Sequence, residues 1–512
     1  MASPPQLGDG PQVGDSPWPP DRDPPLGSSG FRDTSDSLTR AQLRAQPAQP
    51  APAPESQGLR AVAQETAARE APAQAAPARA AQVPAPPGTS KPRLAWLDAL
   101  RGIAALCVVF DHLSYHVLQH VHAVIYRFFD PGLFGVAVFF LVSGYIVPAS
   151  LERGGSVRRF WVGRIFRLYP LFLVAAAVVL VMHEFSVGTL RGVNATPHAA
   201  VFSHLLMLSD LLGVPSVINV FWTLSFEMVF YLLLTALFVL GVHRRSASYA
   251  LGFGVAGLAL GGVLPAVALS DSALGTAKVA ALADLLIIAG LLLAVSGRPR
   301  LRVAGASLAA ATGLVLLTFN DRRIPTEGFV ILALMFTGTM LYRWQQGQFG
   351  ASRAAWTAVA VFALITAAGA WHIGQVAAPA AAQAGTPRRW VISLVAAGLA
   401  FGIGLALRHR RFPAALAWLG LVSYSIYVLH YPVIYLYDKI SWTRGPHPIG
   451  IQLLLAAAFL VVLLGCAGAS YFIVEAPMQR LGRRLGRGLD ARFDTDRVAA
   501  GRRVWTPPSQ AS

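Results

Sequence analysis

The chain has 512 residues, of which 54% are apolar and 13% are charged, and its formal net charge is +17. The apolar residues form blocks of about 17–24 residues between positions 94 and 474, each long enough to cross a bilayer as a helix. This pattern excludes a soluble globular protein, whose helices would be half polar. The two cysteines, Cys107 and Cys466, argue against a disulfide framework. The basic residues lie in loops and tails, so they indicate membrane orientation and lipid contact, with no nucleic-acid partner.

Residues 1–90 are dominated by Ala, Pro, Gly, Gln and Ser and hold few large apolar side chains. Such a segment buries too little surface to offset its ordering entropy, so we expect a disordered cytoplasmic arm. A Pro-rich docking arm is the alternative, although no sharp ligand motif stands out. The N-terminus lacks a basic segment followed by an apolar core, which argues against a cleaved secretory signal.

From residue 95 onward the sequence predicts an all-α polytopic membrane protein with about 10–12 transmembrane helices. We expect the transmembrane domain over residues 91–478 and a basic cytoplasmic tail over residues 479–512, which can lie on anionic lipid as a surface helix. The approximate centres of the candidate spans are Ala105, Phe140, Ala175, Phe230, Leu258, Ile287, Ala310, Met335, Leu364, Leu399, Val428 and Leu463.

The arginines of the short loops predict the orientation, because basic loops stay in the cytoplasm. Placing both termini in the cytoplasm of a cell (inner or plasma) membrane puts most of the basic loops inside. Two pairs are exceptions and fall in outer loops, namely Arg322-Arg323 and Arg388-Arg389. The inner loops hold Arg153, Arg158, Arg159, Arg244, Arg245, Arg298, Arg300, Arg302, Arg343, Arg353, Arg408, Arg410 and Arg411.

One outer connection, over residues 183–219, is longer than the others. It either folds back on the membrane and helps to form an external acceptor site, or is an ordinary surface loop. Its ionisable residues are His183, Glu184, His198, His204 and Asp210.

Ionisable side chains inside a span cost about 3 kcal/mol or more, so they usually face the bundle interior and serve a function. In the first span Arg101 and His112 are eleven residues apart, which places them on one helix face and about 16 Å apart along the axis. This spacing suits a long donor with an anionic head at Arg101 and a reactive end at His112. Histidine is a natural general base for a hydroxyl, because its pKa lies near neutrality. A structural histidine bonded to another helix is the alternative.

The second and third spans hold further candidates. Ser143 lies in a Gly-rich and Ser-rich segment, whose simplest role is close helix packing. Arg164 and Arg167 stand three residues apart at the start of the third span, where two guanidinium groups can clamp phosphates. Positive-inside anchoring explains the preceding arginines better than it explains these two.

The fourth and eleventh spans each carry polar groups in apolar surroundings. Glu227 follows Trp222 and can orient a catalytic histidine, bind the acceptor or pair with an arginine. Ser423, Tyr427 and His430 share one helix face, which indicates a site or a cavity. Interhelical hydrogen bonding is the alternative for this stripe.

Five ordered motifs resemble the membrane-bound acyltransferase-3 family, which O-acylates carbohydrates and related acceptors. They extend from Leu97 to Pro432 and are Leu-Asp-x-Leu-Arg-Gly-Ile-Ala-Ala-Leu with Arg101-x10-His112, Gly135 to Gly144, Arg164-x-x-Arg167-x-x-Pro170, Trp222 to Tyr231, and Ser423 to Pro432. The resemblance implies a cytoplasmic acyl-CoA such as acetyl-CoA as co-substrate, an outer acceptor hydroxyl on a carbohydrate-containing molecule, and no permanently bound cofactor or metal.

The resemblance also implies roles for individual residues. His112 is expected to be catalytic, with Glu227 and His430 as further candidates, and Arg101, Arg164 and Arg167 to bind the donor. The expected acceptor or support residues are Ser143, Trp222, Ser423 and Tyr427. Direct attack on the thioester and a covalent acyl carrier both stay open.

Two departures from the family pattern stand out. Many members carry Asp where this chain has Ala137, and some carry an appended esterase-like domain, for which the stretch after Ala476 is too short, so we expect the stand-alone form. A transporter or exporter of a glycolipid or sugar remains the alternative function, although no internal repeat is evident. A non-catalytic membrane scaffold is a third reading, but it would need no buried Arg-x10-His pair.

Overall fold

The computed structural model describes residues 94–188, 197–270, 272–323, 325–376, 386–440 and 447–492. The predicted N-terminal arm and the end of the predicted tail lie outside these residues. The described part is helical and holds no strand. Its α-helices are α2 (Ala95–His116), α3 (Gln119–Ile125), α4 (Pro131–Gly154), α5 (Val157–Glu184), α6 (Pro197–Leu205), α7 (Trp222–Val239), α8 (Ser246–Leu260), α9 (Ala273–Ala294), α10 (Pro299–Phe319), α11 (Pro325–Gln345), α12 (Ala351–Val376), α14 (Thr386–Ala406), α15 (Ala414–Leu421), α16 (Ser423–Lys439), α17 (Ile449–Ser470) and α18 (Ala476–Arg492).

Every predicted span centre lies inside one of these helices. Among the described residues, nine helices are long and apolar enough to cross a membrane, and the bent pair α15 and α16 makes a tenth if it counts as one span. α8 is short, with 15 residues, and α2 is too polar to qualify because it carries Asp98, Arg101, Asp111 and His112. The prediction of an all-α polytopic membrane protein is confirmed.

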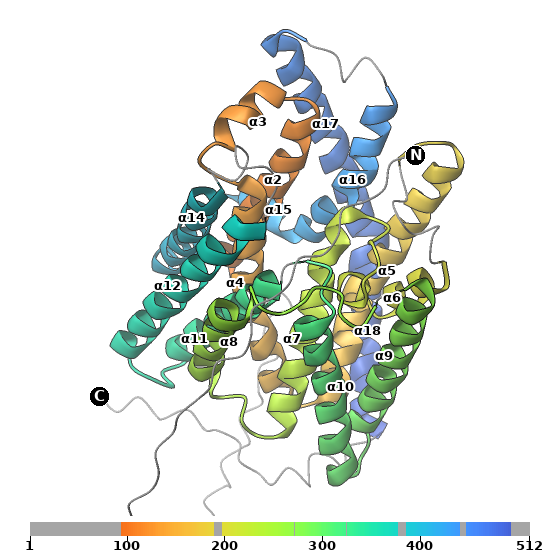
Figure 1. Cartoon of the computed structure of the whole chain (residues 1–512), viewed down its shortest axis with the longest axis vertical. Coiled ribbons are helices and arrows are strands. Elements are labelled where there is room, and N and C mark those ends of the chain that lie inside the picture. The colour runs from red at the N-terminus through yellow and green to blue at the C-terminus, as the bar shows by residue number, and fades with distance from the viewer. Residues whose placement is uncertain are drawn as a thin grey trace, which may run out of the picture. The chain divides into compact units, whose positions relative to one another are not determined.

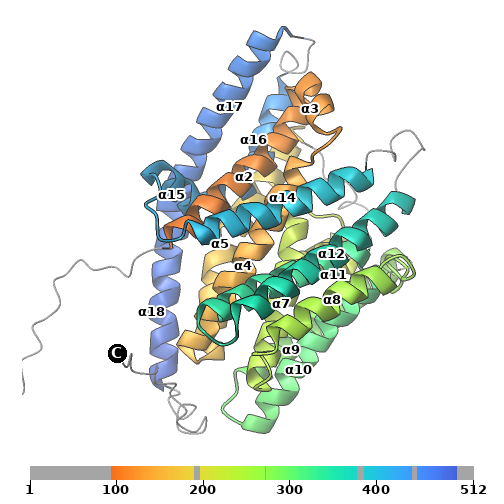
Figure 2. The same ribbon diagram turned by 90° about the vertical axis from the view of Figure 1, so that its left-hand side faces the viewer.

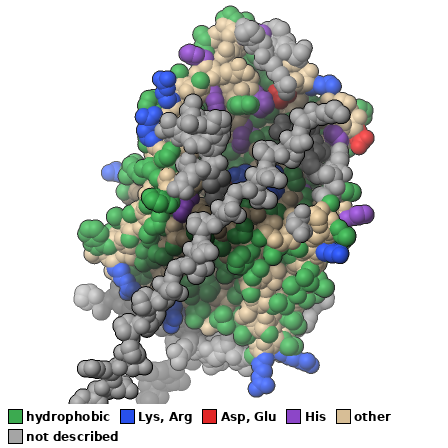
Figure 3. All heavy atoms as spheres, viewed as in Figure 1, with side chains coloured by type: hydrophobic (Ala, Val, Ile, Leu, Met, Phe, Trp, Pro, Cys, Tyr) green, Lys and Arg blue, Asp and Glu red, His purple; other side chains and the backbone are tan. Residues whose placement is uncertain are grey.

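The outer surface of the bundle is apolar. Leu282, Leu285 and Leu292 of α9 and Val315 of α10 are exposed, and Figure 3 shows hydrophobic side chains over much of the molecule's face with basic side chains mostly toward its margins. Such a large apolar surface is suited to lipid and not to water. The chain is therefore a multi-pass membrane protein.

Three helices, α4, α7 and α11, form the centre of the bundle. Their apolar windows are 61%, 78% and 89% buried, against 17–39% for the other candidate spans. Figure 1 shows α12 and α14 on one side of these helices and α9 and α10 on the other. Glycines bring α4 and α11 into contact, because a Cβ at Gly144 would lie 1.9 Å from the Met335 carbonyl oxygen.

Local sequence signals set the ends of α4 and the start of α5. Asp130 caps α4 by accepting a hydrogen bond from the Leu133 N–H at 2.7 Å, and Pro131 occupies the first helical position. α4 ends at Gly154 and is capped by Gly155, whose φ of 61° is the left-handed conformation that glycine adopts easily. Ser156 then caps α5. This short turn places the predicted arginines of α5 directly after α4.

The last described segment differs from a free surface helix. α17 continues through a π-helical turn (Tyr471–Glu475) into α18, and Figure 2 shows the two helices following one another along one side. α18 packs on α5, where Arg159 and Asp490 form an ion pair at 2.5 Å and a Cβ at Gly482 would meet Phe166. The basic side chains that α18 exposes are Arg480, Arg483, Arg484 and Arg487.

Candidate active site

Two cavities lie side by side between the central helices and contain most of the predicted residues. The first, which we name the arginine cavity, has a volume of about 70 Å³ and is lined by residues of α2, α4, α5, α7 and α16. The second, the histidine cavity, measures about 310 Å³. Val136, Phe140 and Tyr427 line both cavities, so these three side chains form the partition between them.

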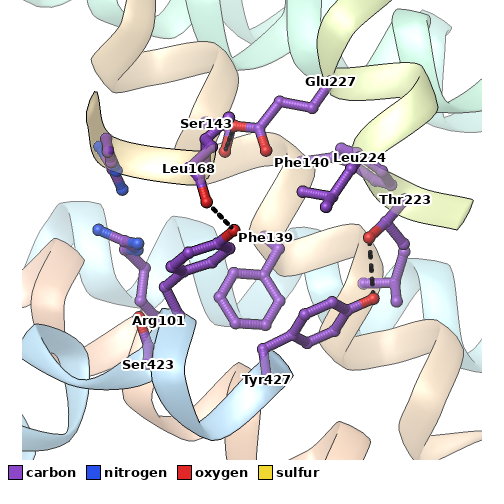
Figure 4. A pocket seen from close by; sticks show the side chains of 13 residues that line it. Arg101, Phe139, Phe140, Ser143, Leu168, Thr223, Leu224, Glu227, Ser423 and Tyr427 are labelled. Atoms are coloured by element: carbon purple, nitrogen blue, oxygen red, sulfur yellow. Dashed lines mark hydrogen bonds between the residues drawn. The ribbon is translucent and has the colours of Figure 1, made fainter. Parts of the chain in front are cut away.

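The arginine cavity brings together six of the ten predicted site residues from five helices. Its walls include Arg101, Ser143, Arg167, Glu227, Ser423 and Tyr427. Figure 4 shows Arg101 and Ser423 on one side of the cavity and Ser143 beside Glu227 on another. The Tyr427 hydroxyl shares a hydrogen bond of 2.9 Å with Thr223. The site is therefore made by residues far apart in the sequence.

Arg101 and Arg167 form a partly buried pair of cations in this cavity. Each side chain is within electrostatic range of the other, and Glu227 and Glu475 supply opposite charges nearby. Glu475 was not predicted from the sequence; it lies on the π-helical turn and accepts a hydrogen bond from Ser425. The arrangement can bind an anionic or carbonyl-rich ligand while the carboxylates limit the repulsion between the arginines.

Arg164, unlike Arg167, is not among the residues that line the arginine cavity. Its guanidinium carbon is 5.6 Å from the ring centroids of both Phe160 and Tyr231, and Tyr231 in turn donates a hydrogen bond to Glu227. Arg164 therefore contacts the arginine cavity through Tyr231 and Glu227 and does not line it. Ser143 is at the limit of hydrogen-bond distance from Glu227, at 3.5 Å, and completes this chain.

His112 lines the histidine cavity and is joined to His430, whose side chain is fully buried. The His112 Nδ1 and His430 Nε2 atoms are 3.0 Å apart, and the His430 Nδ1 lies 3.3 Å from the Ile426 carbonyl oxygen. A carbonyl oxygen can only accept, so Nδ1 of a neutral His430 carries the proton and its Nε2 accepts from the His112 Nδ1–H. The His112 Nε2 lone pair is then the basic site, which is what a general base requires.

The predicted pair Arg101 and His112 thus lies in two different cavities that meet at Tyr427. Ser423 lines the arginine cavity, but its hydroxyl donates to the Gly420 carbonyl at 2.9 Å, which gives it a structural partner. The helix that carries the polar stripe begins after a break at Val422, where α15 and α16 meet with a bend of 67°. The polar stripe from Ser423 to His430 lies entirely in α16.

Trp222 lines the histidine cavity beneath an arginine. The Arg323 guanidinium carbon is 3.7 Å from the Trp222 ring centroid, and Arg323 donates to Glu327 at 3.2 Å. Arg323 lies in the loop between α10 and α11. Burial alone would lower the pKa of Arg323, but Glu327 and Asp210 raise that pKa above its ordinary value. The guanidinium is therefore a fixed positive charge at the cavity wall.

Several residues of the histidine cavity were missed from the sequence. They are Asp111, Tyr126, Asp130, Arg323, Glu327 and Arg389. A signal existed for three of them: Arg323 and Arg389 belong to the two basic pairs that violate the orientation rule, and Asp111 is an ionisable residue within a span. Ala137, where many family members carry Asp, also lines this cavity.

The long connection after α5 lines the histidine cavity directly at Asn219 and otherwise supports it from behind. Asp210 is buried and lies 3.9 Å from the Arg323 side chain, and the His204 ring accepts a hydrogen bond from the Val217 N–H. Glu184 and His198 are exposed, and residues 189–196 lie outside the described ranges. Part of the connection thus supports the wall that holds Arg323.

A family profile described as an acyltransferase domain matches residues 94–471, which is most of the chain. The chain belongs to the acyltransferase-3 family. The resemblance predicted from the five motifs is confirmed, and the family domain covers both cavities.

The relatives of this acyltransferase-3 member match only part of it. Acyltransferase MdmB of Streptomyces mycarofaciens is 32% identical over 27% of this chain and 38% of its own length. Peptidoglycan O-acetyltransferase OatA of Listeria monocytogenes is 28% identical over 27% of this chain and 23% of its own length. Nodulation protein 10 of Rhizobium leguminosarum is 31% identical over 22% of this chain and 34% of its own length. The chain thus spans less than half the length of each of these relatives, and no solved structure matches it.

Proposed function

We propose that the protein is a membrane O-acyltransferase that moves an acyl group, most simply acetyl, from acyl-CoA to a hydroxyl of a carbohydrate-containing acceptor. The observation that carries this proposal is the pair of adjoining cavities, one with two partly buried arginines and the other with a histidine whose Nε2 is left as a base. A transferase needs two substrates to meet at one reacting centre, and the partition at Tyr427 is where two such ligands would meet.

The donor belongs in the arginine cavity. Arg101 and Arg167 are suited to the phosphate or carbonyl oxygens of acyl-CoA, because guanidinium groups form strong charge-assisted hydrogen bonds. The cavity volume of about 70 Å³ is smaller than the donor, so its entry requires the surrounding helices to separate. Along α2 the thioester would then lie toward His112, about 16 Å from Arg101.

The acceptor belongs in the larger histidine cavity. A platform of Trp222 and several charged side chains is typical of carbohydrate binding, where rings stack on aromatic faces and hydroxyls are hydrogen-bonded. Relatives named as peptidoglycan O-acetyltransferases support a cell-envelope glycan as the acceptor.

In the direct route His112 Nε2 removes the proton from the acceptor hydroxyl while its oxygen attacks the thioester carbonyl carbon. The tetrahedral intermediate collapses with cleavage of the C–S bond. The CoA sulfur leaves and takes the proton from the His112 imidazolium, which gives an O-acyl ester and free CoA. His430 holds His112 in the tautomer that this step requires.

The basic loops support an orientation in which both termini face the cytoplasm of a cell membrane. In that orientation the arginine cavity opens toward the cytoplasmic acyl-CoA and the histidine cavity toward the outer loops. Acyl transfer would then deliver the group across the membrane.

The test is acyl transfer by the purified protein in lipid nanodiscs, with radiolabelled acetyl-CoA and a peptidoglycan-containing envelope extract. We expect base-labile label in the glycan, reduced about 10²–10⁴-fold in His112→Gln by loss of the base. His116→Gln is the matched control, because His116 pairs with Asp438 at 3.0 Å and lines neither cavity.

Full activity in His112→Gln would overturn the mechanism. No transfer by the wild type from acetyl-CoA or longer acyl-CoAs would overturn the function and favour an exporter of a glycolipid or sugar.

A further inference from the structure

Asp111 is the residue immediately before the proposed catalytic base, and it lines the same cavity. Its carboxyl group packs against the start of α4, where a Cβ at Gly132 would lie 2.7 Å from Asp111 Oδ2. The other oxygen, Oδ1, is shielded from solvent and has no hydrogen-bond partner among the described residues. A shielded acceptor without a partner is costly, so a donor supplied by a ligand would stabilise it.

The other carboxylates of the histidine cavity already have partners. Asp130 accepts from the Leu133 N–H at 2.7 Å and from the Tyr126 hydroxyl at 3.0 Å. Glu327 accepts from Arg323 at 3.2 Å. Asp111 is therefore the acid in this wall, among the described residues, that has an oxygen to offer, and it lies next to His112.

We propose that Asp111 Oδ1 accepts a hydrogen bond from a second hydroxyl or N–H of the acceptor, beside the hydroxyl that His112 deprotonates. This inference rests on the proposed function and deepens it. Adjacent residues of a helix point 100° apart, and Asp111 and His112 both reach the one cavity, so together they can hold two neighbouring groups of one sugar ring. The acceptor class is then a polyol or amino sugar whose reacting hydroxyl has a hydrogen-bond donor beside it.

Asp111 would also exclude certain acceptors from the site. A carboxylate or phosphate next to the reacting hydroxyl would meet the Asp111 carboxyl group and a second acid, Asp130, in a water-poor wall, where like charges repel strongly. A ring that carries only acceptors at that position would leave Oδ1 without a partner. Asp111 thus acts as a positioning and specificity residue, whereas the proton transfer stays with His112.

The experiment measures acetyl transfer from acetyl-CoA to a panel of methyl glycosides, methyl N-acetylglucosaminide among them, and to their monodeoxy analogues. The parent glycoside is the one that the wild-type protein acetylates most efficiently. Variants are Asp111→Ala, Asp111→Asn and Gly132→Ala, the last to displace the carboxyl group through its neighbour. Asp438→Asn is the control, because Asp438 is paired with His116 away from both cavities.

We expect Asp111→Ala to lower kcat/KM for the parent glycoside about ten- to hundredfold, as for a hydrogen bond to a charged group. The KM for acetyl-CoA should not change. One monodeoxy analogue should be a poor substrate of the wild type and should lose no further activity in Asp111→Ala. Asp111→Asn keeps an acceptor oxygen, so its kcat/KM for the parent glycoside should lie between the values of the wild type and Asp111→Ala. Gly132→Ala should lower kcat/KM as Asp111→Ala does.

Equal losses for the parent and for every monodeoxy analogue would overturn the inference and leave Asp111 as a tie between α2 and α4. Unchanged activity in Asp111→Ala would overturn it as well. Failure of the proposed function is distinct from both results, since the wild type would then consume no acetyl-CoA with any acceptor.

Discussion

Replacing His430 with Leu tests whether this buried histidine acts through His112. The substitution removes the 3.0 Å hydrogen bond to His112 Nδ1 and fills the position with an apolar side chain of similar volume. One such hydrogen bond contributes about 0.5–1.5 kcal/mol, and a buried N–H that loses its acceptor costs about 1–3 kcal/mol. We expect kcat to fall about tenfold or somewhat more, since 1.4 kcal/mol is a factor of ten.

The assay is the initial rate of acetyl transfer with varied acetyl-CoA, which separates kcat from KM. The KM for acetyl-CoA should be unchanged, because the arginine cavity that we propose for the donor is not lined by His430. His430→Gln should recover part of the lost rate, since its amide oxygen can still accept from the His112 Nδ1–H. Wild-type kcat in His430→Leu, or no gain from Gln over Leu, would refute the tautomer argument.

Two further predictions concern the donor site and the packing of the central helices. Arg167→Ala should raise the KM for acetyl-CoA about ten- to hundredfold through loss of charge-assisted hydrogen bonds. Arg300→Ala, at an exposed position on α10, is the control and should leave this KM unchanged. Equal effects of the two substitutions on the KM would contradict the donor assignment. Gly144→Ala should lower the free energy of unfolding by about 1–3 kcal/mol, because the added Cβ would clash with the backbone of α11. The measurement is the midpoint of thermal unfolding in detergent, which should be lower for Gly144→Ala than for Gly402→Ala, whose Cβ meets open space. Equal midpoints for the two variants would contradict the prediction.

Span positions were predictable because each depends on a local property, the length of an apolar run. The break between α15 and α16 was not, because it accompanies a tertiary contact. A Cβ at Gly420 would lie 2.0 Å from the Asp98 carbonyl oxygen, so α15 crosses α2 at backbone contact just before the chain bends into α16. No local pattern in residues 414–423 reports where α2 will lie.

The candidate site was predictable in its residues and not in its division into two cavities. Intramembrane cost alone identified Arg101, His112 and Glu227, because such groups are rarely tolerated in a span without a purpose. Whether Arg164 lines the arginine cavity, as Arg167 does, depends on the position of Tyr231 in another helix. The two basic pairs that depart from the orientation rule were a signal that the sequence analysis did not use. Arg323 and Arg389, one from each pair, line the histidine cavity.

The central claim is that the donor and the acceptor reach the reacting centre from opposite sides of the membrane. The most direct measurement uses sealed, uniformly oriented vesicles with acetyl-CoA on the cytoplasmic side only and the glycan acceptor on the other side only. We expect acetylated glycan on the side opposite to acetyl-CoA, and none with His112→Gln. Product formed only when both substrates share one side would contradict this claim.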